Sequence, residues 1–128
     1  MFKSIKSFIQ RGKRGYADSD WYSFHSYLTD IIIPNIRKLK DNVHGCPGDL
    51  WDESAKNNET HKWTEILEEI AQGFEAAKFL DGYGYHKWVP LPEGGSKLEI
   101  DTESLNNAYK KMTRGMELFG KYYINLWD

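Results

Sequence analysis

The chain has 128 residues, enough for one hydrophobic core, and we expect a single helical domain over residues 1–128. Hydrophobic residues make up 40% and charged residues 28% of the chain, which excludes wholesale disorder. The longest apolar run, residues 31–33, is far shorter than the roughly 20 residues of a membrane span, and the lone Cys46 cannot form an intrachain disulfide. We therefore expect a cytoplasmic protein with no membrane partner.

A basic amphipathic helix is predicted over residues 2–11, before Gly12 interrupts the pattern. Its polar positions include Lys3, Lys6 and Arg11. Such a helix can be an arm for a membrane surface or a nucleic acid, but we favour a terminal helix that docks its apolar stripe on the main core. The stripe consists of Phe2, Ile5, Phe8 and Ile9.

A second helix is expected to begin near Asp18 or Ser19, because both residue types are favoured N-caps and Asp20 adds negative charge in the first turn. Pro34 lacks an N–H group, so we expect a kink or break after Ile33 and a further segment to about Lys40. The predicted core stripe is Trp21, Phe24, Leu28, Ile31, Ile32 and Leu39.

A long loop is predicted over residues 42–58, where turn-forming residues replace helical periodicity. Loops of this length are either mobile or functional. His44 and Cys46 suggest a nucleophile pair or half of a metal site. Because the sequence has no Cys-x-x-Cys or His-x-x-x-His, we expect no metal and no cysteine catalysis.

A third helix is predicted to follow an N-cap at Thr60 and to end before Gly82. Gly73 within it indicates that another backbone passes close by. His61, Glu65 and Glu69 share a face that we interpret as solvated, because the Glu-x-x-His of di-metal bundles is missing. The predicted stripe is Trp63, Ile66, Leu67, Ile70, Phe74 and Ala77.

The spacing of apolar residues is no longer helical near residues 84–100, where a small β-hairpin is possible. A last helix begins near Thr102 and is expected to close the bundle. The fold class is therefore all-α, a mostly helical bundle of three long helices with a short N-terminal helix. The stripe of the last helix is Leu105, Ala108, Tyr109, Met112, Met116, Phe119, Tyr123 and Leu126.

Four segments carry a resemblance to a known family. They are Arg-Gly-Tyr-Ala-Asp-Ser-Asp-Trp from Arg14 to Trp21, His44-Gly45-Cys46-Pro47, Trp63 with Leu67 and Gly73-Phe74, and Asn125-Leu126-Trp127-Asp128. Together they resemble a family of small uncharacterised proteins encoded by tailed bacteriophages and prophages. The resemblance implies a phage-encoded protein that acts in the cytoplasm of a bacterial host cell or is carried in a particle. It implies no catalytic residues.

The richest cluster of candidate site residues surrounds the first of these segments. Paired carboxylates can hold a cation or share acid–base work, and a helix N-terminus beside cations can receive a phosphate. Helix termination explains the same acids, and we favour that structural interpretation. The candidate ligand- or partner-binding residues are Arg11, Lys13, Arg14, Tyr16, Asp18, Asp20, Trp21 and His25.

Composition favours a binding role over an enzymatic one. The chain has 5 Trp, 8 Tyr and 6 Phe, and its net charge of −2 divides into +5 over residues 1–40 and −7 over the remainder. The two parts can pair internally, which is our default, or the basic end can meet an acidic partner. Glycine-rich phosphate loops are missing from the sequence, so we expect no cofactor.

Three hypotheses remain open. The first is a non-enzymatic phage accessory protein that acts by protein–protein interaction, by binding or inhibiting a host or phage protein or by assembling into a homo-oligomer. The second is a protein that captures or cleaves a nucleotide-like anion with Arg14, Tyr16, Asp18, Asp20 and Trp21. The third, nucleic-acid binding through the basic N-terminus, is less favoured because the chain is nearly neutral.

Overall fold

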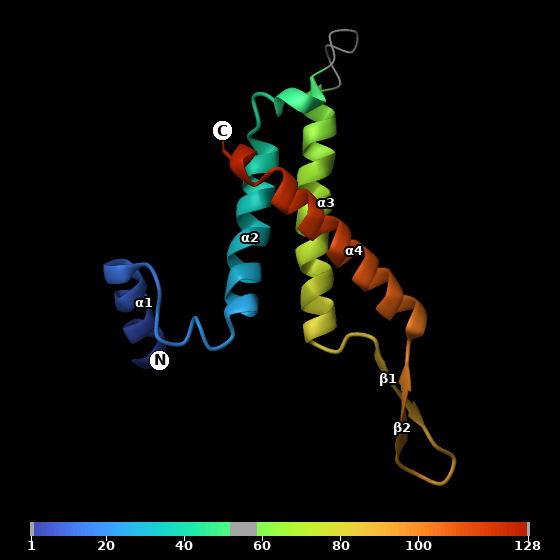
Figure 1. The fold of residues 1–128 in the computed structure, drawn as a ribbon. Coiled ribbons are helices and arrows are strands. Elements are labelled where there is room, and N and C mark those ends of the chain that lie inside the picture. Colours follow the sequence, from blue (N-terminus) through green and yellow to red (C-terminus); the bar gives the residue numbers. More distant parts are fainter. Residues whose placement is uncertain (1, 52–58, 128) are drawn as a thin grey trace.

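The computed structural model describes residues 2–51 and 59–127, and its fold is mostly helical, as predicted, with 66% helix (Figure 1). Part of the predicted 42–58 loop, residues 52–58, lies outside the described residues. The elements are α1 (Phe2–Arg14), α2 (Phe24–Asp41), the 3-10 turn η1 (Gly48–Leu50), α3 (Glu59–Asp81), β1 (His86–Pro90), β2 (Ser96–Ile100), α4 (Thr102–Lys121) and the 3-10 turn η2 (Tyr123–Asn125).

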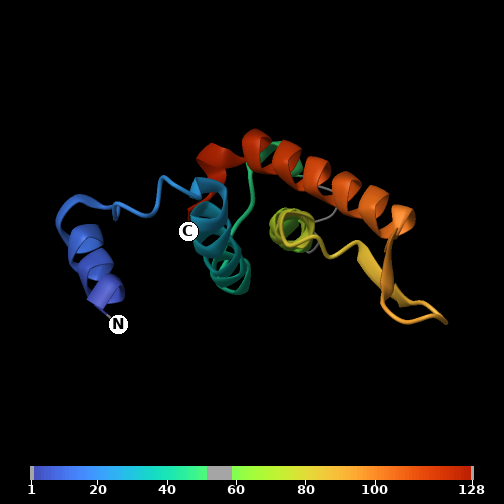
Figure 2. The ribbon, with the colours of Figure 1, turned by 90° about the horizontal axis from the view of Figure 1, so that it is seen from below.

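Three helices build the body of the molecule. The helices α2 and α3 run side by side in opposite directions, and α4 crosses α3 obliquely on one side of this pair (Figures 1 and 2). The helix α1 stands apart from the other three in both views, and the β-hairpin projects away from them. The last helix packs against α3, as expected of the closing helix, but crosses it obliquely instead of lying along it. None of the described helices combines the length and apolar character that crossing a bilayer demands.

The core follows the stripe predicted for α3. Large side chains of α3 meet aromatic residues in α4 and directly after it, with ring centroids 5.3 Å apart in both the Trp63–Tyr122 and Phe74–Phe119 pairs. Burial of these rings away from water is the main stabilising contribution. The buried cluster consists of Ile36, Trp63, Leu67, Ile70, Ala71, Phe74, Leu118 and Tyr122.

Gly73 marks the point where α3 and α4 cross, which confirms the prediction of a close backbone. A Cβ atom added to Gly73 would lie 2.6 Å from the Cα of Gly115 and 3.0 Å from the carbonyl oxygen of Lys111. A Cβ atom added to Gly115 would likewise lie 2.6 Å from the Cα of Gly73. Two glycines in contact thus allow the helix backbones to approach without intervening side chains.

The stripe predicted for α4 is displaced from the face that packs on α3. The residues of α4 that are buried are Ala108, Gly115 and Leu118, whereas Tyr109 and Met116 are exposed. The spacing of apolar side chains did not predict Gly115 as a buried position, because glycine has no side chain. The N-terminus of α4 lies where it was expected, and the Asp101 carboxylate caps it by accepting a hydrogen bond from the backbone N–H of Ser104 (3.2 Å).

The predicted hairpin is present. Strands β1 and β2 pair antiparallel, with His86 opposite Ile100 and Pro90 opposite Ser96. The connecting turn uses Gly94 and Gly95 at φ of +98° and +78°, a backbone conformation that favours glycine.

Two expected helix starts are wrong. The helix α2 begins at Phe24, with Ser23 in the N-cap position, so neither Asp18 nor Ser19 caps it. The two acids upstream, Asp18 and Asp20, instead pair with Arg14 and Arg11 of α1. The helix α3 begins at Glu59, which places Thr60 inside its first turn.

The expected break at Pro34 is also absent, because α2 runs through it to Asp41. Packing of Ile36 in the core, with the partly buried Ile32 and Ile33 beside it, compensates for the hydrogen bond that proline cannot donate.

Candidate functional site

Asp20 fixes the segment that follows α1. Its carboxylate accepts hydrogen bonds from Arg11 Nε (3.0 Å), Arg11 Nη2 (2.5 Å) and the backbone N–H of Ala17 (2.7 Å). Asp20 is only 5% exposed, and Ala17 is fully buried. A bidentate arginine–carboxylate pair constrains orientation as well as distance, so this contact sets the direction of α1.

Asp18 makes a second, exposed attachment to the same helix. Its carboxylate accepts from the Arg14 guanidinium and from Gln10 Nε2 (2.8 Å), and its backbone N–H donates to Gln10 Oε1 (2.9 Å). Gly15, at φ +84°, ends α1 and turns the chain back along it. The segment is therefore folded against the polar side of α1.

The charges in this cluster neutralise one another. The hydrogen bond from Arg11 is the main reason that the pKa of Asp20 lies below its usual range, and the Arg14 guanidinium, followed by Gln10, does the same for the pKa of Asp18. The rings of Tyr27 and Tyr16 lie 5.1 and 4.4 Å from the Arg11 and Arg14 guanidinium carbons. Both guanidinium groups thus have an acid and an aromatic face as partners.

The structure brings together five of the eight predicted site residues. These five are Arg11, Arg14, Tyr16, Asp18 and Asp20. His25 lies in α2 and contacts Asp81 of α3 through Nε2 at 2.9 Å, while Lys13 and Trp21 are exposed.

The apolar face of α1 is turned to solvent, so the expected docking of this face on the core is wrong. Phe8 is 77% exposed, and Ile5 and Ile9 are about half exposed. Ser7 and Gln10, on the other side, are more buried than these apolar residues. The reason is that the arginine–carboxylate contacts hold α1 by its polar face. The side chain of Phe2 lies outside the described residues.

Exposed aromatic residues also follow α1 in the chain. Tyr16, Trp21, Tyr22 and Phe24 are all more than half exposed, and Tyr22 reaches 82%. We call residues 2–23 the N-terminal arm. Sequence reasoning missed Tyr22, assigned Phe24 to the core, and gave Trp21 both as a core residue and as a candidate binding residue, because helical spacing does not reveal which side of a helix is covered.

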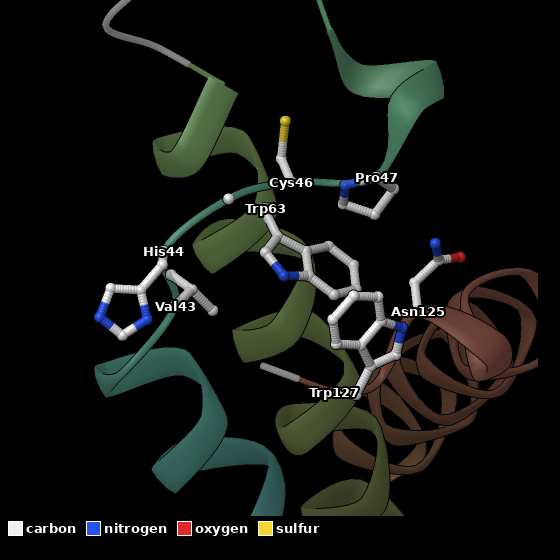
Figure 3. A pocket seen from close by; sticks show the side chains of 8 residues that line it. Val43, His44, Cys46, Pro47, Trp63, Asn125 and Trp127 are labelled. Atoms are coloured by element: carbon white, nitrogen blue, oxygen red, sulfur yellow. The ribbon is translucent and has the colours of Figure 1, made fainter.

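A separate pocket unites three of the four segments that carry the family resemblance. Residues 43–47 form one side, Trp63 of α3 lies behind them, and Asn125 and Trp127 approach from the C-terminal end (Figure 3). Its volume is about 340 Å³. Sequence reasoning did not find this pocket, since its parts are up to 84 positions apart in the chain.

Aromatic and small side chains make up most of the lining of this pocket. None of the described residues that line it is a Lys, Arg, Asp or Glu. The His44 imidazole and the Cys46 thiol point to different sides of their loop in Figure 3, which is not the arrangement of a nucleophile and its base. Tyr122, whose ring contacts Trp63 of the pocket, donates its hydroxyl hydrogen to Asp49 Oδ2 (2.8 Å). Burial, followed by this bond, raises the pKa of Tyr122.

A second hollow is a groove bounded by α2, α3 and α4, with a volume of about 660 Å³. Its floor includes Phe74 of α3. One wall contains Leu28 and Ile32 of α2, and the opposite wall is built by the displaced α4 stripe, Tyr109, Met112, Met116 and Phe119. The residues predicted to close the core thus line an open groove.

Within residues 2–51 and 59–127, no group of three or more His, Cys, Asp or Glu side chains is placed to hold a metal ion. Searches of family models, curated proteins and solved structures found no match to the chain.

Proposed function

We propose that this protein is a binding module that attaches to a partner protein through its N-terminal arm. One observation carries the proposal: α1 is held to the rest of the chain by its polar face and presents its apolar face outward. A helix that served only to cover the core would have the opposite orientation.

The arm is also prepared for binding. Because Arg11 and Arg14 fix α1 through several hydrogen bonds, little order has to be gained when a partner docks. An amphipathic helix with adjacent Trp and Tyr side chains suits a partner that offers an apolar groove. In the setting that the family resemblance implies, the partner is a host or phage protein.

Nucleotide capture has less support from this geometry. The guanidinium groups that would bind a phosphate are already paired with Asp18 and Asp20. The same pairing withdraws two cations from nucleic-acid binding, which depends on the number of phosphates neutralised.

To test the proposal, the 128-residue chain is immobilised, and the proteins that it retains are identified by quantitative mass spectrometry. Among the described side chains of α1, Phe8→Asp removes the most exposed apolar one, and Ile124→Asp changes an 82% exposed residue outside the arm as the matched control. We expect a protein retained by the wild type and by Ile124→Asp to be lost with Phe8→Asp. Equal retention by both variants, with unchanged thermal melting, contradicts a role for the arm.

A further inference from the structure

The molecule exposes two apolar surfaces that match in kind. The groove between α2 and α4 is lined by Leu28, Ile32, Met112, Met116 and Phe119. Methionine side chains are flexible and polarisable, and grooves rich in them accept the apolar face of an incoming helix. The apolar face of α1 is such a helix face, and it has the side chains of Ile5, Phe8 and Ile9 to insert.

The two surfaces have comparable lengths, and α1 differs in net charge from the rest of the chain. The 13 residues of α1 extend about 20 Å, and the groove wall from Tyr109 to Phe119 extends about 15 Å at 1.5 Å per residue. All five charged residues of α1 are Lys or Arg, whereas the chain after α1 has a net charge of −7. Lys6 and Lys13 border the apolar face. The edge of the groove carries Asp81, paired with His25, and Lys78, paired with Asp30.

The groove of the same chain is not the natural site for this helix. The bidentate Arg11–Asp20 contact and the Arg11–Tyr27 contact hold α1 beside the start of α2 with its apolar face outward. Turning that face into its own groove would break these contacts. A groove on another molecule can receive it with the contacts intact.

We propose that the occupant of the groove is the α1 helix of a second copy of this chain, with the two arms exchanged reciprocally. This inference rests on the proposed function and names its partner. A single short helix face covers only part of the roughly 1,200 Å² that specific interfaces bury, and a twofold arrangement makes the same contact twice.

Sedimentation equilibrium of the full chain, over micromolar concentrations, tests the assembly. We expect a dimer for the wild type and for the control Ile124→Asp. Phe8→Asp on the helix and Met116→Asp on the groove should each raise the dissociation constant at least about tenfold. A monomeric wild type, or dimers unaffected by both changes, would overturn the inference.

Disulfide trapping locates the contact. In a Cys46→Ser background, chains with Phe8→Cys are mixed with chains with Met116→Cys, and oxidation should give a mixed disulfide dimer. Ile124→Cys in place of Phe8→Cys is the matched control and should give none. Equal yields in both mixtures, or an intrachain disulfide in a monomeric Phe8→Cys/Met116→Cys chain, contradicts exchange between copies. If the wild type is a monomer but still captures another protein in a Phe8-dependent way, the proposed function stands and this inference fails.

Discussion

The α3–α4 crossing and the N-terminal arm use amphipathic helices in opposite ways. At the crossing, apolar residues and two glycines face inward, and the helix backbones come into contact. In the arm, arginine–carboxylate pairs face inward, and the apolar side of α1 faces solvent. An amphipathic pattern therefore identifies a helix with an apolar face but does not indicate which molecule covers that face.

The largest effect is expected at the crossing. Gly73→Ala places a methyl group 2.6 Å from the Cα of Gly115, and backbone atoms on both sides cannot move aside as a flexible side chain can. We expect a loss of about 3 kcal/mol in the free energy of unfolding, the upper range for overpacking. Urea denaturation followed by circular dichroism measures it.

Gly120→Ala is the matched control for that substitution. Gly120 lies within a helix, α4, as Gly73 lies within α3. A Cβ atom added to Gly120 would meet nothing within 4 Å. The change should stabilise the protein by up to about 1 kcal/mol, because alanine favours the helix. Equal losses for Gly73→Ala and Gly120→Ala would show that helix propensity, and not the crossing, determines the outcome.

Asp20→Asn is expected to loosen α1 from the segment of residues 16–20 while leaving the body folded. The amide can accept one hydrogen bond but gives up the charge that pairs with Arg11. Amide hydrogen exchange in residues 10–20 should become at least about tenfold faster, the result of losing over 1 kcal/mol of local stability. Exchange in α3 should not change. If α3 also loses protection, the arm and the body are one cooperative unit and the contrast between them is wrong.

The arm should respond to acid before the crossing does. The pKa values of Asp18 and Asp20 are lowered in the folded chain. Their stabilising effect is therefore complete above the ordinary carboxyl value of about 4 and is lost as the pH falls through the lower folded values. Nuclear magnetic resonance of the Ala17 amide between pH 6 and pH 2 should show release only below about pH 4. Release above pH 5 would contradict the lowered pKa values.

The smallest effect is expected for Asp18→Asn. Asp18 does not cap α2, and its contacts with Gln10 and Arg14 are exposed, where ion pairs contribute little to stability. The urea midpoint should remain within error of the wild type, and exchange in the arm should change less than in Asp20→Asn. A larger global loss for Asp18→Asn than for Asp20→Asn would reverse the ranking of the two attachments.

The sequence predicted those features that depend on neighbouring residues. The helical class, the stripe of α3, the hairpin and the close approach at Gly73 are confirmed because periodicity, turn residues and an isolated helix glycine are local signals. The predicted start of α2 was wrong because Asp18 and Asp20 can either cap a helix or pair with arginines. Only the folded chain shows that Arg11 and Arg14 lie within reach of them. The pocket at Trp63 and the groove at Met116 depend on helix placement, which no local pattern encodes.

The Tyr122–Asp49 hydrogen bond has a consequence for the order of folding. It joins residues 73 positions apart, in the same region where Asn125 and Trp127 complete the pocket around Trp63. Contacts this distant in sequence require closing a long chain segment before they give any stabilisation. During synthesis the helices α2 and α3 can associate early, whereas the pocket has to wait for the last few residues of the described chain. We therefore expect it to be among the last features to form and the first to be lost when the C-terminal turn detaches.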